Sequence, residues 1–346
     1  MSTPEHFPHV ASFPHRRAGH CGSGALRDLL EHRGLDYGAG PLSEGTVFGL
    51  GGGLAFLYVE VRDMDPPLYL VGRPADMERN IAVHLGIDLT VRDADDPDKG
   101  WAILRDELDA GRPTMVWADI KHLDYLNVRM HNTRHDVVVI GYDESAGVAF
   151  VADNDRDEIQ TCSLAGLARA RCSEAFPGPN SHTTFVYEWP EQLRDPRESG
   201  RAAIQNAIEN MQSESGGEAL AILRGASGLA GINNFAAGYK DWPQIFGPDL
   251  PAALTGLRVF IVKAGTGGAM FRSLHAQFLH DLGELLEEPA LVSVGKIYDE
   301  LADAWVMLAK CAEALDHESG RQVVRDIARL ENDGVAAMVR LLENGL

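Results

Sequence analysis

Cysteine and basic residues are scarce in this sequence. Its 346 residues include four cysteines, Cys21, Cys162, Cys172 and Cys311, and no two of them form a CxxC pair. This spacing does not fit a zinc ribbon, and few thiols in a long chain indicate a reducing compartment, the cytoplasm. Lys and Arg total 31 against 51 Asp and Glu, so the formal net charge is −20. The charge argues against a nucleic-acid partner, which would require a basic face.

Long hydrophobic runs are also missing. Residues 1–17 contain no continuous apolar core, so no signal peptide is expected. No run approaches the roughly 18 apolar residues that span a bilayer, and we therefore expect no membrane partner. Hydrophobic residues still make up 45% of the chain. That share is typical of a globular protein, and the length suffices for two domains.

One cysteine stands where a helix is expected to begin. Cys21 lies in the small-residue turn Gly-His-Cys-Gly-Ser-Gly, and apolar residues at 25, 26, 29 and 30 follow at helical spacing. The N–H groups and the dipole at a helix N-terminus stabilise a thiolate and could hold an oxyanion. Taken alone, however, Cys21 fits a small buried residue at a helix start better than a nucleophile.

The first 190 residues mix helical and strand patterns. Residues 136–143 form a β-branched run that predicts a buried central strand, and residues 148–153 follow a turn as its hairpin partner. This irregular mixture predicts an α+β fold rather than a doubly wound parallel sheet. Further helices are expected over residues 76–85, 100–110 and 163–171, and further strands over residues 67–73, 114–120 and 183–189.

Composition changes after residue 190. Helical periodicity dominates from there, and a single strand is expected over residues 257–262. We therefore predict a first domain over residues 1–192 and a mainly helical second domain over residues 193–346. Its long helices could form the face of a homodimer or the domain's own core. The expected helices cover residues 201–211, 218–223, 268–286, 294–315 and 321–342.

A histidine and an aspartate flank the predicted hairpin. His135 immediately precedes the first strand, and Asp153 ends the second strand 18 residues later. Antiparallel pairing places the start of one strand beside the end of the other, so these two residues are expected to be neighbours. His135 would then serve as a base for a cysteine nucleophile, with Asp153 orienting its ring. Asn154 is an alternative to Asp153.

The sequence indicates no cofactor and no metal. The glycine-rich residues 48–56 lack the context of a dinucleotide fingerprint and the Lys-Ser/Thr of a P-loop. His131 and His135 are four residues apart, but no HExxH pattern or clear carboxylate ligand accompanies them. His15 and His20 could line a cleft beside Cys21, or they could be ordinary polar residues of a loop.

Several spaced motifs resemble one known family. Residues 16–21, 42–51, 70–73 and 135–143 look like the N-terminal domain of the butirosin biosynthesis protein H family. The segment Ala-Gly-Thr-Gly-Gly-Ala-Met-Phe-Arg at 264–272 looks like the uncharacterised helical domain that usually follows it. The resemblance implies a papain-like cysteine peptidase/transferase fold in the first domain.

The resemblance also implies acyl transfer. Cys21 would attack the thioester of an acyl carrier protein and form an acyl-enzyme. His135 would take the thiol proton and later deprotonate an amine acceptor such as an aminoglycoside, while Asp153 would orient His135. Papain-like proteases place a Gln shortly before the Cys, and this chain has none there. This departure favours an activated thioester donor over a peptide bond.

Two other functions stay open. The same triad could serve a thioesterase, an amidase or a peptide-cyclising enzyme, or the papain-like domain could bind a metabolite without turnover. We also expect substrate contacts from His20, Glu44 and Arg272. The Gly-Thr-Gly-Gly turn at 265–268 could hold a phosphate with Arg272 one helical turn away. The alternative for Arg272 is a structural role in packing.

Overall fold

The computed structural model describes residues 8–61, 65–213, 225–264 and 266–346. The helix expected over residues 218–223 therefore lies outside the described residues. The chain forms two compact units. The first combines Met1–Glu44 with Gly86–Leu193, and the second combines Gly45–Leu85 with Arg194–Leu346.

An antiparallel sheet of six strands forms the centre of the first unit. Its strand order is β3-β8-β4-β5-β6-β7. The β-branched run makes β5 an interior strand, as predicted, and Val137, Val138 and Val139 are fully buried. The strands are β3 (Asp88–Arg92), β4 (Thr114–Ala118), β5 (His135–Asp143), β6 (Val148–Ala152), β7 (Gln160–Ser163) and β8 (Thr184–Glu188).

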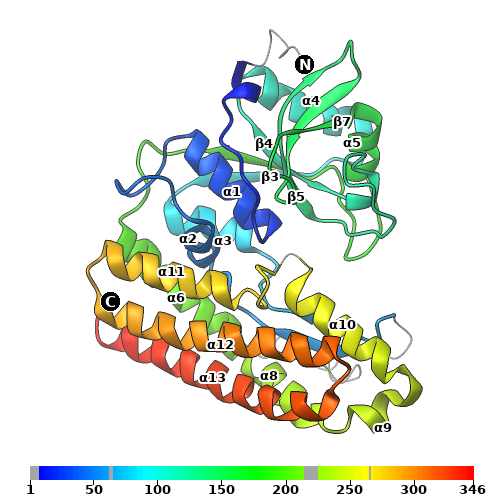
Figure 1. Cartoon of the computed structure of the whole chain (residues 1–346). Helices are drawn as coiled ribbons and strands as arrows, with labels where there is room; N and C mark the ends of the chain where they lie inside the picture. Colours follow the sequence, from blue (N-terminus) through cyan, green and yellow to red (C-terminus); the bar gives the residue numbers. More distant parts are fainter. Residues whose placement is uncertain (1–7, 62–64, 214–224, 265) are drawn as a thin grey trace. The chain divides into compact units, whose positions relative to one another are not determined.

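Helix α1 (Cys21–His32) packs against β5 in the first unit (Figure 1). The apolar face of the helix makes this contact, since Leu26, Leu29 and Leu30 are each only 1% exposed. The helix thus begins at Cys21 and runs along the strand that begins at His135. The remaining helical segments of this unit are α4 (Pro97–Asp109), α5 (Leu164–Arg171) and the 3₁₀ turns η1 (Pro8–Ala11) and η2 (Ile120–His122).

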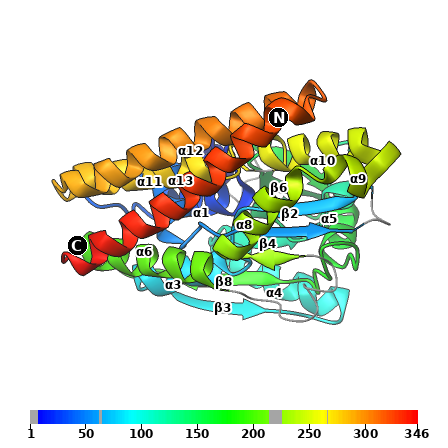
Figure 2. The same ribbon diagram turned by 90° about the horizontal axis from the view of Figure 1, so that it is seen from below.

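The second unit is mainly helical, with a small sheet ordered β2-β1-β9. The long helices α12 and α13 lie side by side in both views (Figures 1 and 2). The strands are β1 (Leu57–Glu60), β2 (Leu68–Val71) and β9 (Ala226–Ser227). The helical segments are α2 (Glu44–Leu50), α3 (Met77–Leu85), α6 (Pro196–Gln212), α8 (Gly228–Tyr239), α9 (Trp242–Phe246), η3 (Gly247–Asp249), α10 (Leu250–Val262), α11 (Arg272–Leu285), α12 (Pro289–Glu313) and α13 (His317–Glu343).

The α+β class expected from the sequence is confirmed, but one predicted strand is wrong. Residues 257–262 belong to α10 and are helical. Ala253, Leu254, Leu257 and Ile261 are buried in this helix, so its apolar residues follow one helical face. A six-residue β-branched window was too short to show that spacing.

The chain crosses between the two units more often than its composition suggests. We expected residues 45–85 within a first domain spanning residues 1–192, but these residues pack in the second unit. The chain leaves the first unit after Glu44, returns at Gly86 and leaves again near Leu193. A single change of composition near residue 190 cannot reveal such an excursion.

One apolar stretch in the described part of the chain has the length and composition of a membrane span. Trp242–Val262 covers 21 residues with a mean hydropathy of 1.4, and 33% of its most apolar window is buried. Gly247, Pro248 and Asp249 interrupt the apolar residues, so no continuous apolar run predicts this stretch. The stretch comprises α9, η3 and α10 rather than one continuous α-helix. It is weak evidence for a span, because core helices can share these properties.

Candidate active site

Cys21 occupies the first position of α1, as the sequence predicted. The N-cap residue is His20, whose Nδ1 accepts a hydrogen bond from the Ser23 backbone N–H at 3.2 Å. The N–H groups of Cys21 and Gly22 lie in the first turn, where no earlier turn supplies carbonyl partners. The half-buried Cys21 thiol therefore lies at the positive end of a helix dipole.

The Glu44 carboxylate holds the turn that presents Cys21. It accepts hydrogen bonds from the backbone N–H groups of Gly19 at 2.9 Å and His20 at 2.8 Å. It also accepts one from the Ser23 hydroxyl at 3.1 Å. We expected Glu44 to contact substrate, but these three bonds make it a positioning residue for the nucleophile turn.

His135 and Asp153 lie together, as the hairpin predicted. His135 Nε2 and Asp153 Oδ2 are 3.1 Å apart, and both side chains are buried. The Tyr125 hydroxyl donates to the same Asp153 oxygen at 2.7 Å, and the Asp155 N–H donates to Oδ1 at 3.0 Å. The Asp153 carboxylate is thus fixed by three donors, and it holds the His135 ring through Nε2.

The electrostatics of Cys21 and His135 favour a thiolate–imidazolium pair. Burial raises the pKa of Cys21, but the His20 and His135 imidazoles outweigh it and hold that pKa well below the usual value. Burial lowers the pKa of His135, but Asp153 and Cys21 together raise it well above normal. Burial likewise opposes ionisation of Asp153, yet His135 lowers the pKa of Asp153 to about 2. The arrangement can supply a nucleophile and a proton donor at neutral pH.

Asp136 is a site residue that the sequence reading missed. The Cys21 thiol donates to Asp136 Oδ2 at 3.6 Å, and Asp136 is only 1% exposed. Successive residues of a strand normally point to opposite faces, so Asp136 was not expected beside the same thiol as His135. Its carboxylate accepts from the thiol form and repels the thiolate. An ionised Asp136 would therefore oppose the effect of the two imidazoles.

We predict that Asp136→Asn lowers the pKa of Cys21. Asparagine keeps the size of the side chain and removes the repelling charge. The inflection in the rate of Cys21 alkylation by iodoacetamide should move to lower pH by about one pH unit. Asp143→Asn, at the other end of β5, is the matched control and should leave the profile unchanged. An inflection that stays in place or rises in Asp136→Asn contradicts the assigned role.

Two further candidates serve the scaffold around Cys21. His15 is buried, with Nδ1 2.6 Å from Asp28 Oδ2 and Nε2 3.1 Å from the Arg156 carbonyl. Asn154 donates through Nδ2 to the Ala18 carbonyl at 3.2 Å, while Asp153 contacts His135. His15 is therefore held away from any direct role, and the alternative of Asn154 as the orienting residue does not apply.

Arg272 lies in the interior of the second unit and is not placed to bind substrate. Its side chain is fully buried, and Nε donates to Glu331 at 2.8 Å. Its other donors reach the carbonyl oxygens of Gly72, Met270 and Ala55. The expectation that Arg272 holds a phosphate is wrong, because the guanidinium has no exposed surface and its donors are occupied. These contacts fit the alternative role for Arg272, a structural role in packing.

Loss of this buried pair should strongly destabilise the protein. We predict that Arg272→Ala lowers the free energy of unfolding by about 3–5 kcal/mol, because Glu331 would be left buried without its counter-charge. The control Arg258→Ala breaks a partly exposed pair with Glu313 and should cost less than about 1 kcal/mol. Urea denaturation of both variants measures the difference. Equal losses in the two variants would contradict this role of Arg272.

One group of side chains has the composition of a metal site. Ligand atoms of Asp119, His122 and His131 lie within 4.8 Å of one another. Protein groups already occupy two of the three residues: Asp119 Oδ2 contacts His131 Nδ1 at 2.6 Å, and the Lys121 ammonium is 2.8 Å from His131 Nε2. Asp119 also accepts from two backbone N–H groups and the Ser173 hydroxyl. The cluster is thus held by internal hydrogen bonds, with a lysine where a cation would bind.

Comparison with known families agrees with the sequence motifs. The family described as butirosin biosynthesis protein H, N-terminal, matches residues 20–154, and a domain of unknown function, DUF4872, matches residues 165–338. The chain belongs to the butirosin biosynthesis protein H family. The resemblance drawn from the motifs is thereby confirmed. No curated protein matches the chain. Cys21, His135 and Asp153 all lie within the N-terminal match of this family member, whereas the second match carries no assigned activity.

Proposed function

We propose that this member of the family is a cysteine-dependent acyltransferase. The observation that carries the proposal is Cys21 at a helix start together with the buried pair of His135 Nε2 and Asp153 Oδ2, which are 3.1 Å apart and interact electrostatically with the thiol. A cysteine at the start of α1 and a histidine on the strand that packs against this helix support a papain-like mechanism. The description of the family adds a link to the biosynthesis of an antibiotic.

The first half-reaction forms an acyl-enzyme. The Cys21 thiolate attacks the carbonyl carbon of a thioester, and the first-turn N–H groups of α1 stabilise the resulting oxyanion. The intermediate collapses with cleavage of the donor C–S bond, and the imidazolium of His135 protonates the departing thiolate. Asp153 keeps the His135 ring aligned and stabilises its charged form.

The second half-reaction transfers the acyl group to an amine. The neutral His135 left by the first step removes a proton from the amine as its nitrogen attacks the Cys21 thioester. Collapse of this intermediate forms an amide and regenerates the thiolate–imidazolium pair. A thioester is already activated, so the donor needs less oxyanion stabilisation than a peptide bond. This is consistent with the lack of a Gln shortly before Cys21.

The chemistry of the chain favours a cationic acceptor. Its formal net charge is −20, and a buried carboxylate, Asp136, lies beside the nucleophile. Both features attract an amine-rich molecule such as an aminoglycoside. The proposed donor is an acyl group carried as a thioester, in the cell on an acyl carrier protein. The cytoplasm is the compartment we propose for this reaction.

Product analysis tests the proposal. The full chain is incubated with an acyl-N-acetylcysteamine thioester, with and without an aminoglycoside, and the products are identified by mass spectrometry. We expect an amide that appears only with the amine and that Cys21→Ala does not form. Free acid produced equally with and without the amine would assign a thioesterase instead. No product, together with a Cys21 that iodoacetamide modifies no faster than free cysteine, would assign a binding protein.

A further inference from the structure

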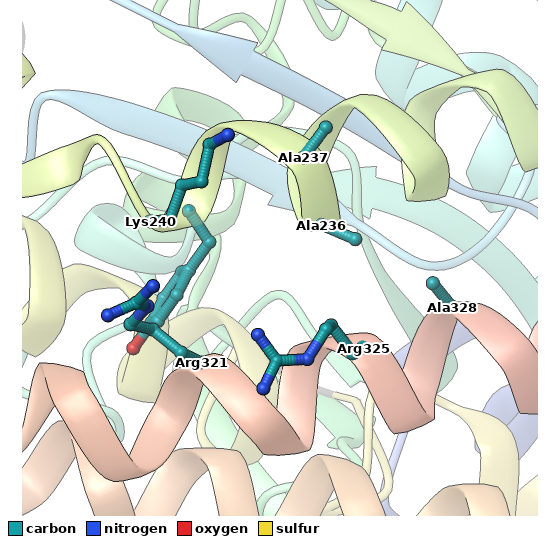
Figure 3. Close-up of a pocket in the computed structure, with 7 residues that line it drawn as sticks. Ala236, Ala237, Lys240, Arg321, Arg325 and Ala328 are labelled. Carbon is teal, nitrogen blue, oxygen red and sulfur yellow. The ribbon is translucent and has the colours of Figure 1, made fainter.

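A basic pocket lies in the second unit, between α8 and α13. It has a volume of about 300 Å³. Lys240, directly after α8, and Arg321 and Arg325, one turn apart on α13, line it. Figure 3 shows the two guanidinium groups extending from α13 toward α8. The spacing of four residues places both arginines on the same face of their helix.

The residues that line this pocket are basic, whereas the chain as a whole is acidic. The whole chain carries a formal net charge of −20, yet none of the described residues that line the pocket is acidic. Arg321 is paired with Glu318 at 2.8 Å, whereas Arg325 donates to the neutral Gln322 Oε1 at 2.6 Å. Within the described ranges, Lys240 and Arg325 form no salt bridge. Two of the three cationic residues that line the pocket, Lys240 and Arg325, therefore have no neutralising carboxylate among the described residues.

Two buried donors at the pocket lack partners. The Tyr239 hydroxyl and the Arg321 Nε are buried, and neither has a hydrogen-bond acceptor in the part of the chain that the structure describes. Tyr239 is only 1% exposed and lines the same pocket. Both atoms are already covered by the chain itself, so a ligand would contact the exposed guanidinium and ammonium groups of the lining rather than these two donors.

We propose that this pocket binds the phosphate group of a small phosphate monoester. Arginine and lysine together bind a dianionic phosphate well, because the guanidinium fork and the ammonium satisfy several oxygens at once. Ala236, Ala237 and Ala328 supply apolar wall beside the cations and can cover the organic part of the ligand. The volume exceeds what a bare phosphate needs and is within the range of small-molecule sites. This binding function is independent of the chemistry at Cys21.

Calorimetric titration of the full chain with glycerol 3-phosphate tests the proposal. We expect saturable binding to the wild-type chain and none to glycerol. Lys240→Gln and Arg325→Gln should each weaken binding about tenfold, because each removes a charge-assisted contact. Arg329→Gln is the matched control, since Arg329 lies on α13 but is paired with Asp333 at 3.0 Å. It should bind like the wild type.

Three outcomes would overturn the proposal. The first is no saturable binding, and the second is binding that Arg325→Gln leaves unchanged. The third is equal affinity for inorganic phosphate, which would remove the assignment to an ester. Cys21→Ala should bind glycerol 3-phosphate as the wild type does. Failure of the acyltransferase proposal can thus be distinguished from failure of this one.

Discussion

Replacement of His135 by alanine is expected to slow acyl transfer about a thousandfold or more. The imidazole lowers the pKa of the Cys21 thiol and, once protonated, supplies the proton for the departing thiolate. Without it, the thiol requires a higher pH to ionise. At pH 6, alkylation of Cys21 by iodoacetamide should therefore fall by about 10- to 100-fold, and its inflection should move to higher pH.

A second histidine provides the control for this experiment. His280 forms a partly exposed pair with Asp299 in the second unit, at 2.8 Å. His280→Ala should retain transfer within about twofold of the wild type, because it breaks only an exposed pair. Circular dichroism is the check that both variants are folded. A folded His135→Ala variant with wild-type transfer would exclude His135 as the catalytic acid and base.

The second large effect is expected at Asp153. Asp153→Ala should also reduce turnover by about a thousandfold, since the carboxylate orients His135 and stabilises its charged form. Asp153→Asn should lose less, about 10- to 100-fold, because an amide oxygen can still accept the hydrogen bond from Nε2. Loss of the negative charge lowers the pKa of His135, so the high-pH limb of the Asp153→Asn rate profile should move to lower pH.

Tyr125 offers a matched control for Asp153. Its hydroxyl donates to the same carboxylate oxygen at 2.7 Å, so it acts on His135 only through Asp153. Tyr125→Phe should reduce turnover far less than Asp153→Ala while keeping the His135–Asp153 charge pair. A rate profile for Asp153→Asn that keeps the wild-type high-pH limb would show that Asp153 does not set the pKa of His135.

Local patterns predicted much of the first unit. The β-branched residues before Gly141 marked a buried strand, the turn at residues 144–147 marked a hairpin, and the structure contains both. Patterns of this kind depend on neighbours in the chain. The packing of residues 45–85 in the second unit depends on contacts distant in sequence, so composition could not predict it. The segment 257–262 was too short for its helical face to be recognised.

The candidate site likewise combines residues that local patterns predict with residues that only the tertiary fold brings together. Cys21, His135 and Asp153 could be brought together from a helix start and a strand pairing. The surroundings of these residues could not be predicted. Asp136 contacts the thiol although strand alternation argues against it, and Glu44 binds backbone N–H groups rather than substrate. Arg272 follows a glycine-rich turn that resembles an anion site, yet its partners come from segments that only the tertiary fold brings near.

The central claim is that Cys21 carries the acyl group during transfer. The most direct measurement is the intact mass of the full chain quenched in acid shortly after mixing with an acyl-N-acetylcysteamine thioester in the absence of amine. Peptide mapping under acid then locates any adduct. We predict a mass increase of one acyl group on the peptide that contains Cys21, absent from Cys21→Ala and discharged by an added aminoglycoside. No adduct in a chain that turns over, or an adduct on Cys162, Cys172 or Cys311 instead, would contradict the account.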